Sequence, residues 1–253
     1  MKTIACYSNK GGVGKTAAAV NLAHAFAGGG ARVLLCDLDP QGASSFYFRT
    51  KPSKRLLQDA FFKDGGRLEA AIRGSDFDNL DILPANLSFR DFDVLLSQMK
   101  HRTSRLDRSL AALKGEYDVV LLDCPPNISL LAENVFAAAD RIVVPVIPTT
   151  LSERAFEQLL EFLAERGKAE PRKVLAFFSM VQRRKSLHLA TMARMRAAHP
   201  KRFLEVEVPF SADVERMGTE RAPVAAFAPR RPAARAFDAL ARALRERLEG
   251  GGA

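Results

Sequence analysis

The chain has 253 residues, of which 47% are hydrophobic and 26% charged, with a formal net charge of +9. No apolar run approaches the roughly 18 residues of a membrane-spanning helix, and no basic region, apolar stretch and cleavage site open the chain. We therefore expect a cytoplasmic protein in which residues 1–253 form a single domain. Cys6, Cys36 and Cys124 lie in or beside apolar runs, which predicts reduced core thiols rather than disulfides or a zinc site.

Continuous apolar runs predict strands at residues 3–8, 32–37, 80–85, 117–124, 141–148, 173–181 and 203–210. Runs that are apolar on both faces are typical of parallel strands covered on both sides. Amphipathic patterns predict helices at residues 15–27, 88–99, 127–139, 151–166, 186–198 and 233–248. Strands that alternate with helices predict an α/β fold, a single doubly wound and mostly parallel sheet that binds ligands beyond the carboxyl ends of its strands.

The positive charge is concentrated in the last third of the chain. Residues 1–167 hold 20 Lys+Arg and 20 Asp+Glu, whereas residues 168–253 hold 18 and 9. This asymmetry predicts an anionic partner, with DNA favoured over an anionic membrane surface. A solvated basic surface is the alternative, because charge balance does not show how the charges cluster in space.

The stretch NKGGVGKT follows the first predicted strand and opens the first predicted helix, which is the context of a phosphate-binding loop. Successive glycines let backbone N–H groups turn toward an anion, and the helix N-terminus adds partial positive charge. Lys15 would reach the β- and γ-phosphates of ATP, and the Thr16 hydroxyl would bind Mg²⁺. The predicted nucleotide-binding residues of this loop are Gly11, Gly12, Val13, Gly14, Lys15, Thr16 and Ala17.

The loop departs from the usual pattern G-x-x-x-x-G-K-[ST] in two respects. Asn9 stands where the pattern has its first glycine, and Lys10 adds a lysine that the pattern does not require. A lysine beside a bound phosphate interacts strongly with it, so we expect Lys10 to have a function of its own.

Carboxylates follow two of the predicted strands. Asp37 and Asp39 lie in CDLDPQG, and Asp123 ends the apolar run of LLDCPP in the form of a Walker B strand. Asp37 and Asp123 are predicted to hold Mg²⁺ through its waters, together with the Thr16 hydroxyl. Asp39 is predicted to orient the water that attacks the γ-phosphate. A single aspartate at a strand end is more often a turn former or helix cap, but three that share one sheet with a phosphate loop favour a metal site.

The segments KGGVGKT, DLDPQG and DCPP, in this order and spacing, resemble the ParA/MinD family of deviant Walker ATPases, and the similarity runs from residue 2 to about residue 248. By this resemblance Lys10 matches the signature lysine that reaches across a nucleotide sandwich homodimer to the partner's ATP. Lys10, Lys15 and Asp39 are then the catalytic residues, with Asp39 in switch I and Asp123 opening switch II. A lysine supplied from another subunit adds charge where it develops in phosphoryl transfer, as an arginine finger does.

The resemblance also implies that Pro209 and Phe210 lie near the adenine. It also implies that the ATP-bound dimer contacts DNA. The candidate contact residues are Arg183, Arg184 and Lys185, and Arg216 is a weaker candidate. Taken singly, each of these is more often a solvated surface residue, whereas together with the C-terminal charge they favour DNA.

After DLDPQG many family members run through small residues, but this chain has Phe46, Tyr47 and Phe48. Aromatic side chains are favoured at protein interfaces, so these residues could anchor a partner or the dimer seam. Packing of a helix on the sheet is the alternative, and the one that we favour.

The resemblance implies a ParA-like ATPase that binds the nucleoid nonspecifically and positions a plasmid, chromosome or protein complex. A ParB-like or other adaptor would stimulate its slow hydrolysis of ATP. The phosphate loop starts at residue 9 with no DNA-reading segment before it, so we expect no sequence-specific autorepression.

Two other functions are open. A MinD-like, membrane-associated ATPase regulating division or flagellar placement would need an amphipathic C-terminal helix, but the narrow apolar stripe in residues 237–248 favours a packed helix and no membrane partner. Dethiobiotin and cobyrinate synthetases share the deviant loop, although no substrate-binding segment of theirs is recognisable here. Iron protein and arsenite pump activities need paired cysteines at a dimer axis or an extra metal site, which the cysteine positions do not suggest.

Overall fold

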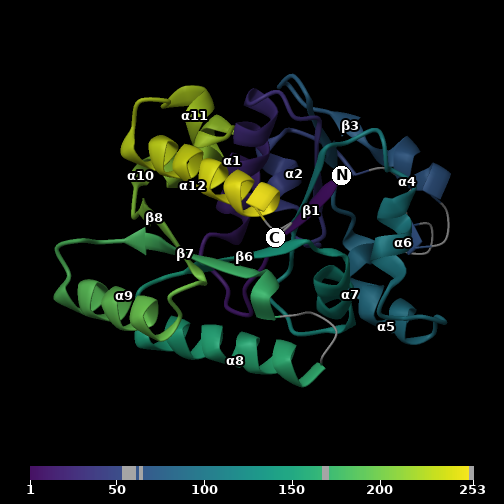
Figure 1. Ribbon diagram of the computed structural model, residues 1–253. Coiled ribbons are helices and arrows are strands. Elements are labelled where there is room, and N and C mark those ends of the chain that lie inside the picture. Colours follow the sequence, from purple (N-terminus) through teal and green to yellow (C-terminus); the bar gives the residue numbers. More distant parts are fainter. Residues whose placement is uncertain (53–60, 63–64, 167–170, 251–253) are drawn as a thin grey trace.

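The computed structural model describes residues 1–52, 61–62, 65–166 and 171–250, so the last three residues of the predicted domain 1–253 lie outside the described part. One sheet runs in the order β3-β4-β2-β5-β1-β6-β7-β8 (Figure 1). Its neighbouring strands are parallel, apart from the short β3, which pairs antiparallel with β4. The strands are β1 (Lys2–Cys6), β2 (Val33–Asp37), β3 (Arg73–Gly74), β4 (Leu80–Leu83), β5 (Val119–Asp123), β6 (Arg141–Val146), β7 (Val174–Val181) and β8 (Phe203–Pro209). The predicted fold class is confirmed.

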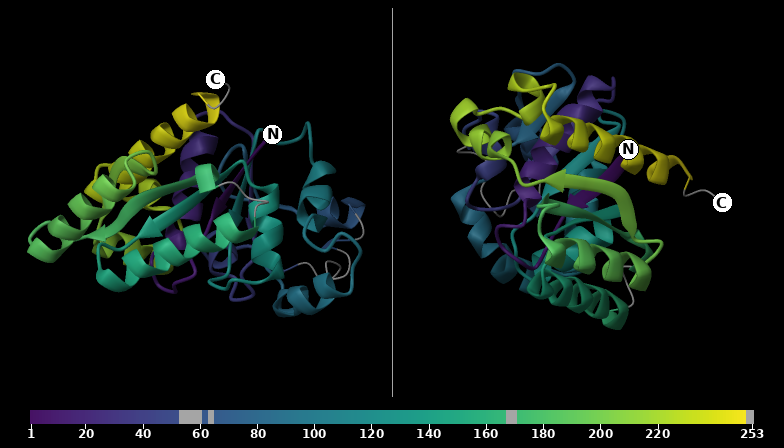
Figure 2. Two further views of the ribbon diagram at one scale, coloured as in Figure 1. Left: turned by 60° about the horizontal axis from the view of Figure 1, so that its bottom comes forward. Right: turned by 90° about the vertical axis from the view of Figure 1, so that its left-hand side faces the viewer.

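Helices cover both faces of this sheet. Helices α5 to α9 lie on one face, and α1, α10, α11 and α12 lie on the other (Figure 1, Figure 2). The α-helices are α1 (Lys15–Gly28), α2 (Ala43–Tyr47), α4 (Gly65–Ala71), α5 (Phe92–Ser97), α6 (Arg105–Ala111), α7 (Leu130–Ala138), α8 (Thr150–Arg166), α9 (Ser186–Ala198), α10 (Ala212–Glu220), α11 (Val224–Phe227) and α12 (Pro232–Glu249). Two 3-10 turns, η1 (Leu87–Asp91) and η2 (Pro171–Lys173), precede α5 and β7.

The central strands contribute alternate residues to two hydrophobic cores, one on each side of the sheet. In β1, Ile4 and Cys6 enter the core beneath α1 and α12, whereas Ala5 enters the core beneath α7 and α8. Because side chains alternate across a strand, only a strand that is apolar at every position can serve both cores. The three cysteines are buried and free, as the sequence predicts.

Helix α12 closes one face of the sheet by packing on α1 and β8. Pro232 occupies its first turn, where the missing N–H costs nothing, and Phe237, Leu240 and Leu244 are fully or almost fully buried. The predicted packing of this helix is confirmed. Among the residues that the structure describes, no helix is long and apolar enough to cross a membrane.

Truncation of Leu244 tests the packing of α12. Leu244 is completely buried, so Leu244→Ala is expected to lower the free energy of unfolding by about 2–5 kcal/mol through lost burial and a residual cavity. Urea titration followed by circular dichroism measures this change. Leu187→Ala is the matched control, because Leu187 is 56% exposed and its loss should cost no more than about 0.5 kcal/mol. Equal effects would show that α12 is not held on the sheet.

Candidate nucleotide and metal site

The sheet order gathers the predicted site residues at one edge. Strand β5 lies between β1 and β2, and the register places Asp123 beside both Cys6, which ends β1, and Asp37, which ends β2. Since the carboxyl ends of parallel strands meet at one edge, the phosphate loop after β1 adjoins both aspartates. This part of the site is therefore fixed by the topology.

The loop turns into α1 at Gly14, which has a left-handed φ of 99°. A Cβ atom at this position would lie 3.0 Å from the Ser179 hydroxyl at the end of β7, so both the backbone angle and the close approach require glycine. The Gly14 carbonyl accepts the first helical bond, from the Ala18 N–H at 2.9 Å. The positive end of the α1 dipole is thereby aimed into the loop.

The Lys15 side chain folds back over this loop. Its Nζ donates to the Lys10 carbonyl at 3.3 Å, and the residue is buried. Burial lowers the pKa of the Lys15 ammonium, and the charge of Asp123 opposes that shift. The cation thus lies between the loop and the aspartates, where a bound phosphate would need it.

Lys10 points elsewhere. Its Nζ donates to the Ser152 hydroxyl of α8 at 3.1 Å, and Ser152 is itself buried. The side chain lines a small cavity between β6 and α8 together with Pro145 and Phe156. The ammonium of Lys10 therefore rests against α8 rather than in the phosphate loop of its own chain.

Asp37 and Asp123 are completely buried side by side. The Ser45 N–H and hydroxyl donate to Asp37 Oδ2 at 2.8 and 2.6 Å, and the Ser44 hydroxyl donates to Asp123 Oδ2 at 2.7 Å. The other oxygen of each carboxylate, Oδ1, has no hydrogen-bond partner in the described part of the chain. Burial raises the pKa of both carboxyls, and the charge of Asp123 raises that of Asp37 further.

A divalent cation fits this arrangement. Two buried carboxylate oxygens without partners are costly unless a cation or proton satisfies them, and the Thr16 side chain lies close enough to Asp123 to lower the pKa of that carboxyl. Within the described ranges no group of three or more His, Cys, Asp and Glu could hold a metal. A site with few protein ligands is what Mg²⁺ favours, because it retains waters and binds phosphate oxygens.

Asp39 forms a turn beyond β2. Its Oδ1 accepts from the Gln41 N–H at 3.0 Å, and its carbonyl accepts from the Gly42 N–H at 2.9 Å. Asp39 therefore does form a turn, which is the alternative role that the sequence analysis gave for an aspartate at a strand end. The charge of Asp39 also raises the pKa of Asp37 and Asp123, so its carboxylate lies near the pair in an orientation set by the turn.

Pro209 and Phe210, predicted to lie near the adenine, line a cavity of about 60 Å³ that also includes Gly14 and Ala17 of the loop region. Phe210 directly follows β8 and is 55% exposed, so its ring is accessible to a flat ligand. The structure thus brings these residues to the same end of α1 as the phosphate loop.

The residues predicted to contact DNA have different surroundings. Arg183, Arg184 and Lys185 are exposed in the turn between β7 and α9. Arg183 pairs with Glu207 at 2.8 Å, whereas Arg184 and Lys185 form no ion pair with any described residue.

Arg216 is more fully engaged. It pairs with Glu220 at 2.7 Å and Asp213 at 3.5 Å, and its guanidinium lies 5.1 Å from the Phe227 ring centroid. The turn therefore offers more unpaired charge than Arg216 does.

The three aromatic residues that follow DLDPQG differ in burial. Phe48 is buried in the core, and Tyr47 packs against it, whereas Phe46 is 49% exposed. The Arg221 guanidinium covers the Phe46 ring at 4.6 Å, and Arg221 Nε donates to the Phe46 carbonyl at 3.1 Å. Helix packing, the favoured expectation, holds for two of the three residues.

Sequence reasoning missed the serines that support the site. Ser44 and Ser45 bind the two aspartates, and Ser152 binds Lys10. Two adjacent hydroxyls that begin two residues after the final glycine of D-x-D-P-Q-G were the available signal, because buried carboxylates need donors. For Ser152, 142 residues away from Lys10 along the chain, the sequence offered no such signal.

A parallel sheet whose central strand leads through a glycine-rich loop into a helix, with a buried aspartate ending the next strand, defines a P-loop nucleotide-binding protein. A family model described as an AAA domain matches residues 1–174. The chain is 30% identical over 249 residues to the chromosome partitioning protein ParA of Caulobacter vibrioides, which covers 96% of this chain and 93% of that protein. The chain belongs to the ParA/MinD family of P-loop ATPases.

Solved structures show the same fold. Cobyrinic acid a,c-diamide synthase from Mycobacterium smegmatis, with a bound ATP analog and magnesium, superposes with a TM-score of 0.81 at 26% identity, covering 99% of this chain and 97% of that one. An ATP complex of McdA from Cyanothece superposes with a TM-score of 0.82 at 20% identity, covering 96% of each chain. At that identity the likeness to McdA establishes the fold alone.

Replacement of Ser45 tests the support of the aspartates. The Ser45 hydroxyl donates to Asp37 and accepts from the Ala85 N–H at 2.9 Å, so Ser45→Ala leaves two buried groups without this partner. We expect the free energy of unfolding to fall by about 1–3 kcal/mol, measured by urea titration. Ser97→Ala removes an exposed serine hydroxyl that bonds only the Val94 carbonyl and serves as the control. A similar loss in both variants would contradict this role for Ser45.

Proposed function

We propose that this protein is a ParA-like ATPase that forms an ATP-dependent sandwich dimer, binds DNA nonspecifically and positions a cargo. The cargo would be a plasmid, a chromosome or a protein complex, and an adaptor of the ParB type would stimulate slow hydrolysis. Such a protein would work in the cytoplasm in association with the nucleoid. The 30% identity to a chromosome partitioning protein over nearly the whole chain supports this proposal.

ATP and Mg²⁺ are the proposed ligands of the site. The phosphate loop, Lys15 and the Thr16 hydroxyl would bind the phosphates and the metal, with Asp37 and Asp123 holding metal-bound waters. The two unpartnered carboxylate oxygens support this assignment, as does the bound ATP analog and magnesium in the synthase structure. When bound, Mg²⁺ would neutralise charge that develops on the phosphate oxygens.

The position of Lys10 is the observation that carries the proposal of a dimer. Its ammonium rests on Ser152 at 3.1 Å, outside the loop that Lys15 occupies. A single neutral hydroxyl leaves the charge of Lys10 uncompensated, so the lysine can exchange this partner for a phosphate of a facing subunit. In that arrangement each ATP would be bound by both chains, which makes dimerisation depend on ATP.

Hydrolysis would depend on Asp39. Its backbone turn fixes the side chain just beyond β2, beside the buried aspartates. From there a carboxylate can orient a water for attack on the γ-phosphate. The hydrogen bond from the Gln41 N–H occupies one carboxylate oxygen of Asp39 and leaves the other free to orient the water. A partner protein that alters this turn would therefore alter the rate of ATP hydrolysis.

The two lysines can be separated by mutation. Lys15→Ala is expected to weaken ATP binding about tenfold or more, because a charge-assisted contact to phosphate is lost. Lys10→Ala is expected to retain ATP binding but to lose the ATP-dependent dimer and hydrolysis. A fluorescent ATP analog measures binding, and analytical ultracentrifugation measures assembly. Lys114→Ala, an exposed lysine of the described chain, controls for the loss of one charge. Normal dimerisation of Lys10→Ala would rule out the proposed role of Lys10.

DNA is the proposed partner of the basic turn, residues 183–185. The turn follows β7 and therefore lies at the carboxyl edge of the sheet, the same edge as the nucleotide site. Binding of a facing subunit at that edge would bring two such turns into one assembly. A doubled basic surface binds a phosphate backbone more tightly than either half does, which would couple DNA binding to ATP.

This function is tested by binding to random-sequence duplex DNA with ATP, with ADP and without nucleotide, across a salt series. We expect binding with ATP and a steep fall in affinity with salt. The triple alanine variant of Arg183, Arg184 and Lys185 should flatten the slope of log affinity against log salt by roughly 2 to 3, at ~0.9 for each lost phosphate contact. A change of about 2 is expected if Arg183 stays paired with Glu207 and therefore makes no phosphate contact.

A triple alanine variant of Arg102, Arg108 and Lys114 is the control, because these exposed residues carry the same total charge on another part of the surface. An equal change of slope in both triple variants would show general charge loss rather than a site. Failure of the wild-type protein to bind DNA in every nucleotide state would contradict the DNA-riding mechanism.

A metabolic synthetase is the second candidate, supported by the 26% identity to cobyrinic acid a,c-diamide synthase. Turnover of a carboxylate substrate with ATP at about 1 per second or more would favour that class. The MinD-like alternative has less support, because the apolar residues of α12 are buried against α1 and β8 and are not available to a bilayer.

A further inference from the structure

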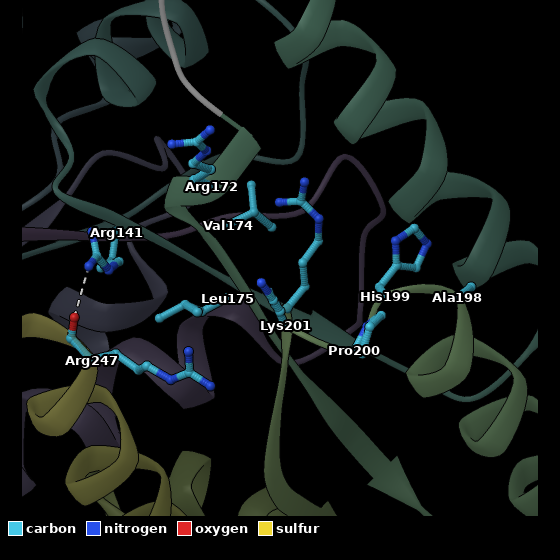
Figure 3. Close-up of a pocket in the computed structure, with 10 residues that line it drawn as sticks. Arg141, Arg172, Val174, Leu175, Ala198, His199, Pro200, Lys201 and Arg247 are labelled. Carbon is cyan, nitrogen blue, oxygen red and sulfur yellow. Dashed lines mark hydrogen bonds between the residues drawn. The ribbon is translucent and has the colours of Figure 1, made fainter. Parts of the chain in front are cut away.

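A large cavity lies at the edge of the sheet opposite the phosphate loop. Its volume is about 510 Å³, and it is lined at the amino ends of two neighbouring strands by Arg141 of β6 and by Val174 and Leu175 of β7 (Figure 3). The turn from α9 to β8, residues 198–202, forms another wall, and Arg247 of α12 reaches the cavity from the far side. We call this cavity the amino-edge pocket.

The amino-edge pocket is strongly cationic. Its described lining includes no acidic residue, and its basic side chains are Arg141, Arg172, His199, Lys201, Arg202 and Arg247. His199 pairs with Glu157 at 2.7 Å. Among the residues that the structure describes, none of the five Arg and Lys side chains forms an ion pair with a carboxylate. Such a concentration of unpaired charge costs repulsion, which an anionic ligand would relieve.

Two of these cations are already held in place. Arg141 donates to the Asp140 and Arg247 carbonyls at 2.9 and 2.8 Å, and Arg202 donates to the Pro171 carbonyl. A carbonyl orients a guanidinium without cancelling its charge. Burial lowers the pKa of Arg202 although Glu157 opposes this shift, so its charge is poorly solvated. Guanidinium groups already held by carbonyls suit phosphate, because little rotational freedom is lost on binding.

We propose that the amino-edge pocket binds a small soluble ligand that carries two or more phosphate groups. Its volume lies within the range of small-molecule sites, about 300–1,000 Å³, and five cations call for more than one anionic group. Val174, Leu175 and Pro200 add apolar surface for an organic part of the ligand. A concave pocket of this size suits such a ligand better than the convex backbone of a DNA duplex.

Inorganic tripolyphosphate is the probe, titrated into the protein in metal-free buffer and followed by calorimetry. The double variant Arg172→Ala, Arg247→Ala removes two exposed cations and leaves the Arg247 carbonyl that holds Arg141. We expect it to bind at least about tenfold more weakly than the wild type. The double variant Arg235→Ala, Arg242→Ala removes two exposed arginines of α12 that do not line the pocket, and its affinity should match that of the wild type.

The phosphate loop is a second site for this probe, so the titration is repeated with Lys15→Ala. Pocket binding should persist in that variant, and its loss would place the ligand in the loop and overturn the proposal. An equal loss in both arginine double variants, or no saturable binding by the wild type, would also overturn it. So would an unchanged tripolyphosphate affinity with weakened DNA binding in the pocket variant, because the surface would then bind nucleic acid. Failure of the ATP-dependent dimer, or of DNA binding through residues 183–185, would leave this test of the amino-edge pocket unchanged.

Discussion

The nucleotide site depends on two buried carboxylates held side by side. Asp37 and Asp123 end neighbouring strands in direct register, where like charges in a poorly solvated interior repel each other strongly. Hydroxyls of Ser44 and Ser45 satisfy one oxygen of each. Because both serines belong to α2, this short helix is held against the strand ends. The need to satisfy these two carboxylates therefore shapes the local backbone as well as the proposed metal site.

Much of the fold was predictable because it follows local patterns. The predicted helix 186–198 coincides with α9, and the helix 233–248 differs from α12 by one residue at each end. The continuous apolar runs gave every parallel strand, since burial on both faces leaves few polar positions. The proximity of the candidate site residues was predictable for a related reason. A phosphate loop and strand-end aspartates need no knowledge of distant contacts once the strands are recognised, because parallel strands bring their ends to one edge.

The remainder depends on contacts between residues far apart in the chain. Helix α2 spans only Ala43–Tyr47, too short for its periodicity to be recognised, and one of its stabilising bonds joins Ser44 to a residue 79 positions away. The number of unpaired charges in the basic turn was equally hidden, because the pairing of Arg183 with Glu207 joins different elements. Strand β3 has two residues and pairs only because β4 offers an open edge. The amino-edge pocket combines arginines from β6, η2, α12 and the turn before β8, which no single segment reveals.

The length of β6 separates the phosphate loop from the amino-edge pocket, the two sites proposed to bind anions. Arg141 begins this strand at the pocket, and Val146 ends it near the phosphate loop; at 3.3 Å per residue this spans about 17 Å. That distance is roughly twice the Debye length of about 8 Å at physiological salt. Two bound anions would then repel each other only weakly through solvent. Ligand binding at one site would therefore be independent of binding at the other, unless a conformational change in the sheet couples them.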